Sequence, residues 1–191
     1  MLQGELLRVA LSWFMQLASA CTHCHANGLV HGQIRPEHAL LASSSRRRRR
    51  ATFPSAPQDA KEPALAVLRD NVAKLLGFCK PELDEARRVP LSRPWGPLDA
   101  PELRDRSSAA PDELIAADCW SLGVLLVFML TGMPPASRPS VLLPPNCHEA
   151  LHEVVDGLME RDPRRRKPAA WACAKVERLL TEADTPVPPS S

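Results

Sequence analysis

The segment that decides the fold of this chain is HGQIRPEHALL, residues 31–41. It joins a polar loop, which contains Gln33 and His38, to a short apolar run at 39–41 that has the composition of a strand. The amide of Gln33 cannot act as a base at neutral pH, and the imidazole of His38 is a poor ligand for Mg²⁺, which prefers oxygen. Gln33 is therefore unsuited to proton abstraction, and His38 is unsuited to magnesium binding.

Four further motifs follow this loop along the chain. They are AKLLGFC at 73–79, APE at 100–102, DCWSLG at 118–123 and DPRRR at 162–166. In this order, and with the loop, they resemble the motifs H-R-D-L-x-x-x-N, D-F-G, A-P-E, D-x-W-S-x-G and D-P-x-x-R of the eukaryotic protein kinase superfamily. The resemblance covers about residues 5–181.

The resemblance implies a mainly α fold, the C-terminal lobe of a protein kinase. This lobe is a helical bundle around a buried central helix, with a small β-hairpin at the degenerate active site. We expect it over residues 1–181, with a basic, Pro- and Ser-containing disordered insertion at 42–70 and a disordered tail at 182–191. No Gly-rich loop, strand Lys or helix Glu precedes the loop, so we expect the N-terminal lobe to be absent.

The resemblance also implies that three reactive positions are replaced. Gln33 stands where the family has the catalytic Asp, His38 where it has the metal-binding Asn, and Gly77 where it has the Asp of D-F-G. Losing a general base and metal coordination together removes most of the means of phosphoryl transfer. We therefore predict a pseudokinase that is not an enzyme, with no metal and no cofactor. Glu37 is expected to face structure and not to replace the base.

The positions that hold this lobe together in the family are retained. They are His31, Glu102, Asp118 and Arg166. The resemblance implies that Asp118 accepts hydrogen bonds from the loop backbone and that Arg166 pairs with Glu102. We expect the loop to fold although its reactive positions differ.

Hydrophobic spacing predicts the main elements of the lobe. Apolar residues at three- and four-residue steps predict an amphipathic helix over 5–25, and a nearly all-apolar run predicts a buried helix over 118–131 that begins at Asp118. Apolar runs at 39–41 and 72–76 predict two short strands that form the only sheet of the lobe.

Composition favours a cytoplasmic protein. The net charge of +2 gives no general attraction to nucleic acid or membrane. We see no apolar run near the roughly 18 residues of a membrane span and no signal sequence, so we expect neither a membrane nor a nucleic-acid partner. The six cysteines are too dispersed for a secreted disulfide framework.

One cysteine cluster has two chemical interpretations. The segment Cys21-Thr22-His23-Cys24-His25 matches the C-x-x-C-H pattern of covalent haem attachment, and it could also supply part of a zinc site. Against both, the chain shows no export signal and no second C-x-x-C pair. We favour an ordinary helix end here.

An arginine run lies within the predicted insertion, at Arg46, Arg47, Arg48, Arg49 and Arg50. It could bind phosphates, an acidic protein surface or a nuclear import receptor, or it could be a solvated charge run. Thr52 follows in a context suited to arginine-directed kinases, and a phosphate there would oppose the run. Both are possible regulatory positions.

These observations predict a catalytically inactive kinase-like domain that serves as a scaffold or regulator in signalling. Its expected partners are proteins, among them an active kinase or that kinase's substrates. One alternative is nucleotide sensing that needs an upper lobe, since we expect no ATP binding by this chain alone. The other is a short, unstable isoform whose face toward the missing lobe is left exposed and apolar.

Overall fold

The computed structural model describes residues 4–43, 71–78, 89–90, 98–104, 106–133, 143–144 and 147–182. This part is mainly helical, as predicted, and contains α1 (Gly4–Ala26), α3 (Pro111–Thr131), α4 (Glu149–Leu158) and α5 (Ala169–Glu182). Its strands are β1 (Ala39–Ser43), β2 (Asn71–Leu75), β3 (Val89–Pro90) and β4 (Ser108–Ala109), and its short 3₁₀ turns are η1 (Pro36–His38) and η2 (Pro101–Leu103). The arginine run, Thr52 and almost all of the predicted insertion and tail lie outside the described residues.

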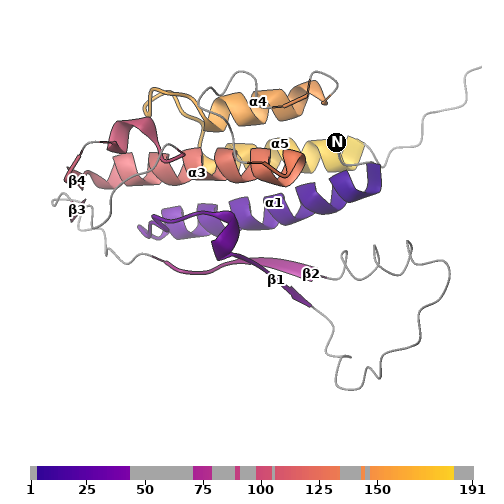
Figure 1. Ribbon diagram of the computed structural model, residues 1–191, viewed down its shortest axis with the longest axis horizontal. Helices are drawn as coiled ribbons and strands as arrows, with labels where there is room; N and C mark the ends of the chain where they lie inside the picture. The colour runs from indigo at the N-terminus through magenta and orange to yellow at the C-terminus, as the bar shows by residue number, and fades with distance from the viewer. Residues whose placement is uncertain are drawn as a thin grey trace, which may run out of the picture.

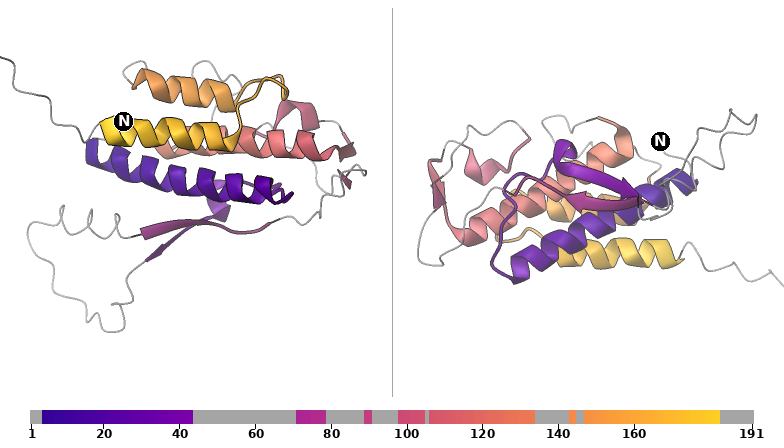
Figure 2. Two further views of the ribbon diagram at one scale, coloured as in Figure 1. Left: turned by 180° about the vertical axis from the view of Figure 1, so that it is seen from behind. Right: turned by 90° about the horizontal axis from the view of Figure 1, so that it is seen from below.

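The elements are arranged in layers around α1 and α3. The β1–β2 hairpin lies on one side of α1, and α3 and α5 pack against the other side (Figure 1). Helix α4 covers α3 and α5 from the far side, which is also seen from behind in Figure 2. This arrangement places α3 at the centre of the bundle.

Helix α1 buries the face that its sequence pattern predicts. Phe14, Leu17, Ala18 and Cys21 are almost fully buried against the neighbouring elements. Burying a large apolar side chain stabilises the fold by about 1.5–3 kcal/mol. The helix ends at Ala26, and in the turn that follows Gly28 has a φ of 67°, which lets the Leu29 N–H donate to the Cys24 carbonyl at 2.9 Å. This turn directs the chain into the loop at residues 31–38.

Helix α3 begins earlier than the apolar pattern predicted. It starts at Pro111, and the Ala110 N–H donates to the Glu113 carboxylate at 2.7 Å. Proline at the first helical position and a carboxylate that caps the preceding N–H are typical start signals. Asp118 therefore lies within the helix and not at its start, which corrects the prediction.

By length and composition α3 could also cross a membrane, so the statement that no apolar run approaches a membrane span was wrong. Of its most apolar window, 67% is buried inside the protein. The central helix of a soluble bundle passes the same test, because it must be apolar on nearly every face.

The hairpin is longer than predicted at one end. Strands β1 and β2 are antiparallel and pair from Ala39 with Leu75 to Ser43 with Asn71. Residues 42 and 43 are thus strand, whereas we predicted them as part of the insertion. The second strand covers 71–75, whereas we predicted 72–76, because Asn71 pairs with Ser43 and Leu75 with Ala39. A second small sheet, β3 with β4, was not predicted, because two-residue strands have no detectable alternation.

Candidate functional site

The candidate site is the loop at residues 31–38 together with the residues that surround it. The loop joins α1 to β1 and lies against the N-terminal half of α3. Asp118 anchors it: the His31 N–H donates to Oδ2 and the Gly32 N–H donates to Oδ1, both at 2.8 Å. A buried carboxylate that accepts backbone N–H groups is worth about 1.5–3 kcal/mol per bond. The sequence resemblance implied this arrangement.

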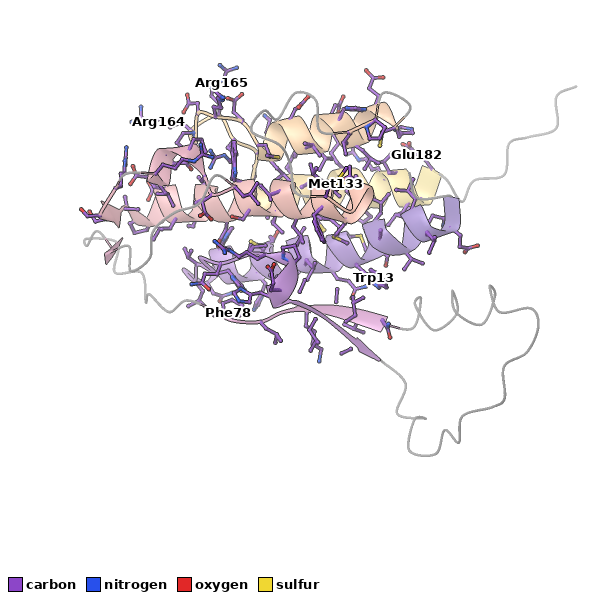
Figure 3. The ribbon with its side chains drawn as sticks, in the orientation of Figure 1. Trp13, Phe78, Met133, Arg164, Arg165 and Glu182 are labelled. Atoms are coloured by element: carbon purple, nitrogen blue, oxygen red, sulfur yellow. The ribbon has the colours of Figure 1, made fainter. Side chains whose placement is uncertain are left out.

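Glu102 and Arg166 lie together at the base of the lobe. Both Nη atoms of Arg166 donate to the Glu102 carboxylate, the Nη2–Oε2 distance being 2.8 Å. Arg166 also donates to the Ala116 and Glu160 carbonyls, each at 2.8 Å, and its guanidinium lies 5.1 Å from the centre of the Trp120 ring. Its neighbours Arg164 and Arg165 point outward from the bundle (Figure 3). The buried guanidinium is therefore almost fully bonded.

His31 lies beneath the hairpin and is fully buried. Its ring packs on Phe78 with 4.4 Å between ring centres. Burial lowers the pKa of His31, and the Asp118 charge and the Leu76 carbonyl partly oppose this. The neutral His31 imidazole therefore connects the loop to Phe78, the residue after Gly77, by ring packing.

The three replaced positions form one cluster. The carbonyl of Gln33 lies 2.7 Å from His38 Nδ1, and the Gln33 N–H donates to His31 Nδ1 at 3.2 Å. Gly77 has a φ of 74°, and a Cβ added there would lie 3.2 Å from the His38 ring. The His38 ring thus fills the space beside Gly77. None of these three side chains carries a carboxylate.

A pocket of about 340 Å³ lies beside the loop. Arg35, Glu37 and Asp99 contribute charged groups, and Arg35 Nη2 donates to the buried Asp99 carboxylate at 3.4 Å. Helix α3 contributes Ser121, Val124, Leu125 and Phe128. Glu37 is exposed and lines this pocket, so the prediction that it faces structure was wrong. Sequence reasoning missed the pocket because Leu98, Asp99 and α3 are brought to the loop only by the fold.

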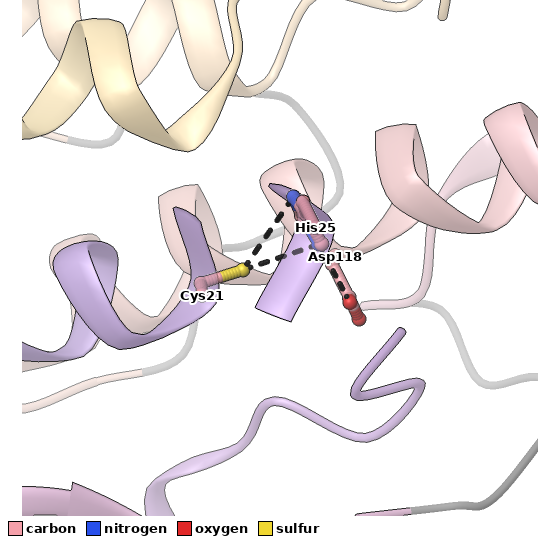
Figure 4. A group of neighbouring side chains, drawn as sticks. All are labelled: Cys21, His25 and Asp118. Atoms are coloured by element: carbon pink, nitrogen blue, oxygen red, sulfur yellow. Dashed lines mark hydrogen bonds and ion pairs between the residues drawn. The ribbon is translucent and has the colours of Figure 1, made fainter. Parts of the chain in front are cut away.

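A second cluster lies between the end of α1 and α3, beside the loop (Figure 4). His25 Nε2 is 3.3 Å from Cys21 Sγ and 3.0 Å from Asp118 Oδ2. Burial, followed by the Asp118 charge, raises the pKa of the Cys21 thiol, and the same two causes raise that of Cys24. The C-x-x-C-H pattern singled out two of these residues. It gave no sign of Asp118, which comes from another helix.

Apolar side chains are exposed on the hairpin side of the loop. Leu40 is 46% exposed and Phe78 is 47% exposed, and Leu41 and Leu76 are similar. Leu40 and Leu41 are consecutive in β1 and point to opposite faces of the hairpin, so these four side chains do not form a single apolar face. The apolar face that we expected toward an upper lobe stays a prediction.

No protein-family model matches the chain. It is similar to three curated kinases, among others. It is 31% identical over 163 residues to serine/threonine-protein kinase SBK2 of Homo sapiens, and the aligned region covers 82% of this chain and 37% of the relative. It is 26% identical over 168 residues to Aurora kinase A-A of Xenopus laevis, with 82% and 34% covered. It is 25% identical over 173 residues to sperm motility kinase 2B of Mus musculus, with 84% and 30% covered.

These relatives contradict one prediction. The replaced positions predicted that the chain is not an enzyme, whereas its relatives are named as kinases, which points to enzymatic activity. The chain spans less than half the length of these relatives. Shared motifs, a mostly helical fold and similarity over about four fifths of the sequence agree on one assignment. The chain belongs to the protein kinase superfamily.

Proposed function

We propose that the chain is a protein-kinase-like domain that acts in kinase signalling by binding other proteins, as a scaffold or a regulator. The expected partner is an active kinase or one of its protein substrates. The observation that supports this role is the pocket between the loop and α3.

The pocket combines features that suit a peptide segment. Its volume of about 340 Å³ lies at the lower end of the range of small-ligand sites, which are mostly apolar with a few polar groups. Val124, Leu125 and Phe128 provide apolar surface. The Asp99 carboxylate is already paired with Arg35, whereas Glu37 places an exposed carboxylate at the rim. We expect an apolar side chain flanked by Lys or Arg to bind here.

This binding role does not depend on phosphoryl transfer. The pocket is lined by residues of the loop and α3 and not by Gln33 or His38, so it can bind a segment that is not phosphorylated there. Rim charges chiefly change the association rate and its salt dependence, so binding through Glu37 should weaken as salt is raised.

The test is a screen of a degenerate peptide library against the full 191-residue chain. The best peptide is then measured by fluorescence anisotropy at two salt concentrations. We expect an apolar residue next to a basic one to be selected, and we expect Glu37→Lys to weaken binding about tenfold or more. Asp156→Lys is the matched control, since it makes the same charge change at an exposed position on α4. Peptides selected without a basic residue, or equal effects of both variants, would contradict the proposal.

The selected peptide, with a Ser or Thr included, also serves in a phosphoryl-transfer assay with radiolabelled ATP and Mg²⁺. Transfer abolished by removing the Ser or Thr would show that the bound protein is also a substrate. Binding with no transfer would assign the pocket a docking role alone.

A further inference from the structure

We propose that Cys21, His25 and Asp118 form a binding site for a zinc-class cation that links the end of α1 to the middle of α3. The site lies beside the loop and shares no residue with the pocket described above. It uses none of the replaced kinase positions.

The positions of the donor atoms suit one metal ion. The ligand atoms of the three residues all lie within 4.8 Å of one another. Tetrahedral zinc, with bonds of about 2.0–2.3 Å, holds its ligand atoms about 3.3–3.6 Å apart. Cys21 Sγ and His25 Nε2 are 3.3 Å apart, and His25 Nε2 and Asp118 Oδ2 are 3.0 Å apart (Figure 4). The third pair, Cys21 Sγ and Asp118 Oδ2, lies within 4.8 Å, and closing this pair to the tetrahedral spacing would admit the ion.

The donor types identify the class of metal. Thiolate, imidazole and carboxylate are all zinc ligands, whereas Mg²⁺ and Ca²⁺ take oxygen donors almost exclusively. Cys21 and Asp118 are buried, and the His25 side chain is only 11% exposed. Water would therefore compete weakly for these donors.

Without a metal ion, the two contacts of His25 Nε2 cannot both be hydrogen bonds at the same time. His25 Nε2 carries either one proton or one lone pair, so it can satisfy only one of its two close neighbours at a time. A cation placed among the three atoms contacts all of them. Asp118 Oδ2 has a second lone pair, so it can keep its hydrogen bond from the His31 N–H. A water molecule would complete the coordination, because among the described residues only Cys21, His25 and Asp118 bring their ligand atoms within 4.8 Å of one another.

Metal binding at this site would affect the conformation of the loop, because Asp118 contacts both. The same carboxylate that would bind the ion also accepts hydrogen bonds from the His31 and Gly32 N–H groups. Binding to the folded state alone stabilises a protein in proportion to the logarithm of the free ion concentration. Zn²⁺ should therefore raise the melting temperature of the chain and hold the loop in the conformation that Asp118 anchors.

The test titrates the full chain, freed of metal by dialysis against a chelator, with Co²⁺. Cobalt takes zinc sites and gives a thiolate-to-metal absorption band that reports a cysteine ligand directly. We expect one equivalent of Co²⁺ per chain, displacement by Zn²⁺, and a higher melting temperature with Zn²⁺. The wild-type titration suffices to overturn the proposal, because a titration without the thiolate band leaves only a hydrogen-bonded cluster.

Variants then assign the ligands. Cys21→Ser, which is nearly isosteric, should abolish the thiolate band, and His25→Gln should weaken binding at least tenfold. Cys147→Ser is the control, because Cys147 is a half-buried cysteine in the segment before α4. Circular dichroism checks that each variant folds. A band that survives in Cys21→Ser, or is lost in Cys147→Ser, would contradict the assignment.

Discussion

Two regions of the lobe differ in how tightly each residue is held. One is the framework of Glu102, Arg166 and Asp118, called the base below, and the other is the hairpin side of the loop with His38 and Gly77, called the upper face below. At the base, Arg166 donates to Glu102 and to two carbonyls, and Asp118 binds two loop N–H groups. On the hairpin side of the loop, His38 and Gly77 lie beside each other, and the next residue, Phe78, is 47% exposed. The base positions match the kinase motifs, whereas the upper ones do not.

The difference follows from what a substitution costs in each place. Removing one partner of a buried ion pair leaves the other charged and unpaired, which is strongly destabilising. Near solvent, water can replace a lost partner, so a change of side chain costs much less. The framework motifs are therefore required for folding, whereas the replaced motifs are compatible with it.

The largest expected effect comes from breaking the ion pair at the base. Arg166→Met should lower the free energy of unfolding by about 3–5 kcal/mol, because Glu102 is then buried without its cation. Arg165→Met, at an exposed neighbouring position, should change it by less than about 0.5 kcal/mol. Urea denaturation followed by circular dichroism measures both. Similar values for the two variants would remove the distinction between the base and the surface.

The next effect concerns the anchor of the loop. Asp118→Asn should cost about 1.5–3 kcal/mol, since the loop loses a charged acceptor and one amide NH₂ must face an N–H donor. Hydrogen exchange of the His31 and Gly32 amides should quicken more than exchange elsewhere in the fold. The control Asp156→Asn changes an exposed carboxylate on α4. Unchanged exchange at those two amides would show that Asp118 does not anchor the loop.

A smaller effect is expected on the upper face. Gly77→Ala should cost about 1–2 kcal/mol, because φ is 74° and the new Cβ would lie 3.2 Å from the His38 ring. In a double-mutant cycle, His38→Ala should recover the part due to the ring contact but not the part due to φ. Gly4→Ala, where an added Cβ has no neighbour within 4 Å, is the control. A fully additive cycle would show that the ring and Gly77 do not compete for space.

The smallest expected effect is a pH dependence from His31, which lies between the two regions. Its pKa is lowered in the folded state, so below the unfolded value of about 6.5 the unfolded chain binds more protons than the folded chain. The free energy of unfolding should therefore fall as pH is lowered from 7.5 through 6.5, by at most about 1.4 kcal/mol per pH unit for one proton. Denaturation at several pH values measures the slope. His31→Gln should reduce it, whereas His23→Gln, at an exposed position, should not.

The predicted helices agree with the structure where the pattern was strong. The apolar spacing of α1 located its buried face, because a helix repeats its neighbours every three or four residues. The start of α3 was missed, because Pro111 and the capping Glu113 precede the apolar run at 118–131 from which the helix was predicted. Periodicity locates the middle of a helix better than its ends.

The sequence by itself determined the kinase family, the framework residues and the three replaced positions, because these are motifs with a fixed order along the chain. Only the tertiary structure brought Asp118 to His25, which lies 93 positions away, and placed the His38 ring beside Gly77. It also formed the pocket that contains Glu37 and Asp99. The physical reason is that such contacts arise from the packing of α1 on α3 and of the hairpin on α1, and linear order does not specify which side chains that packing brings together.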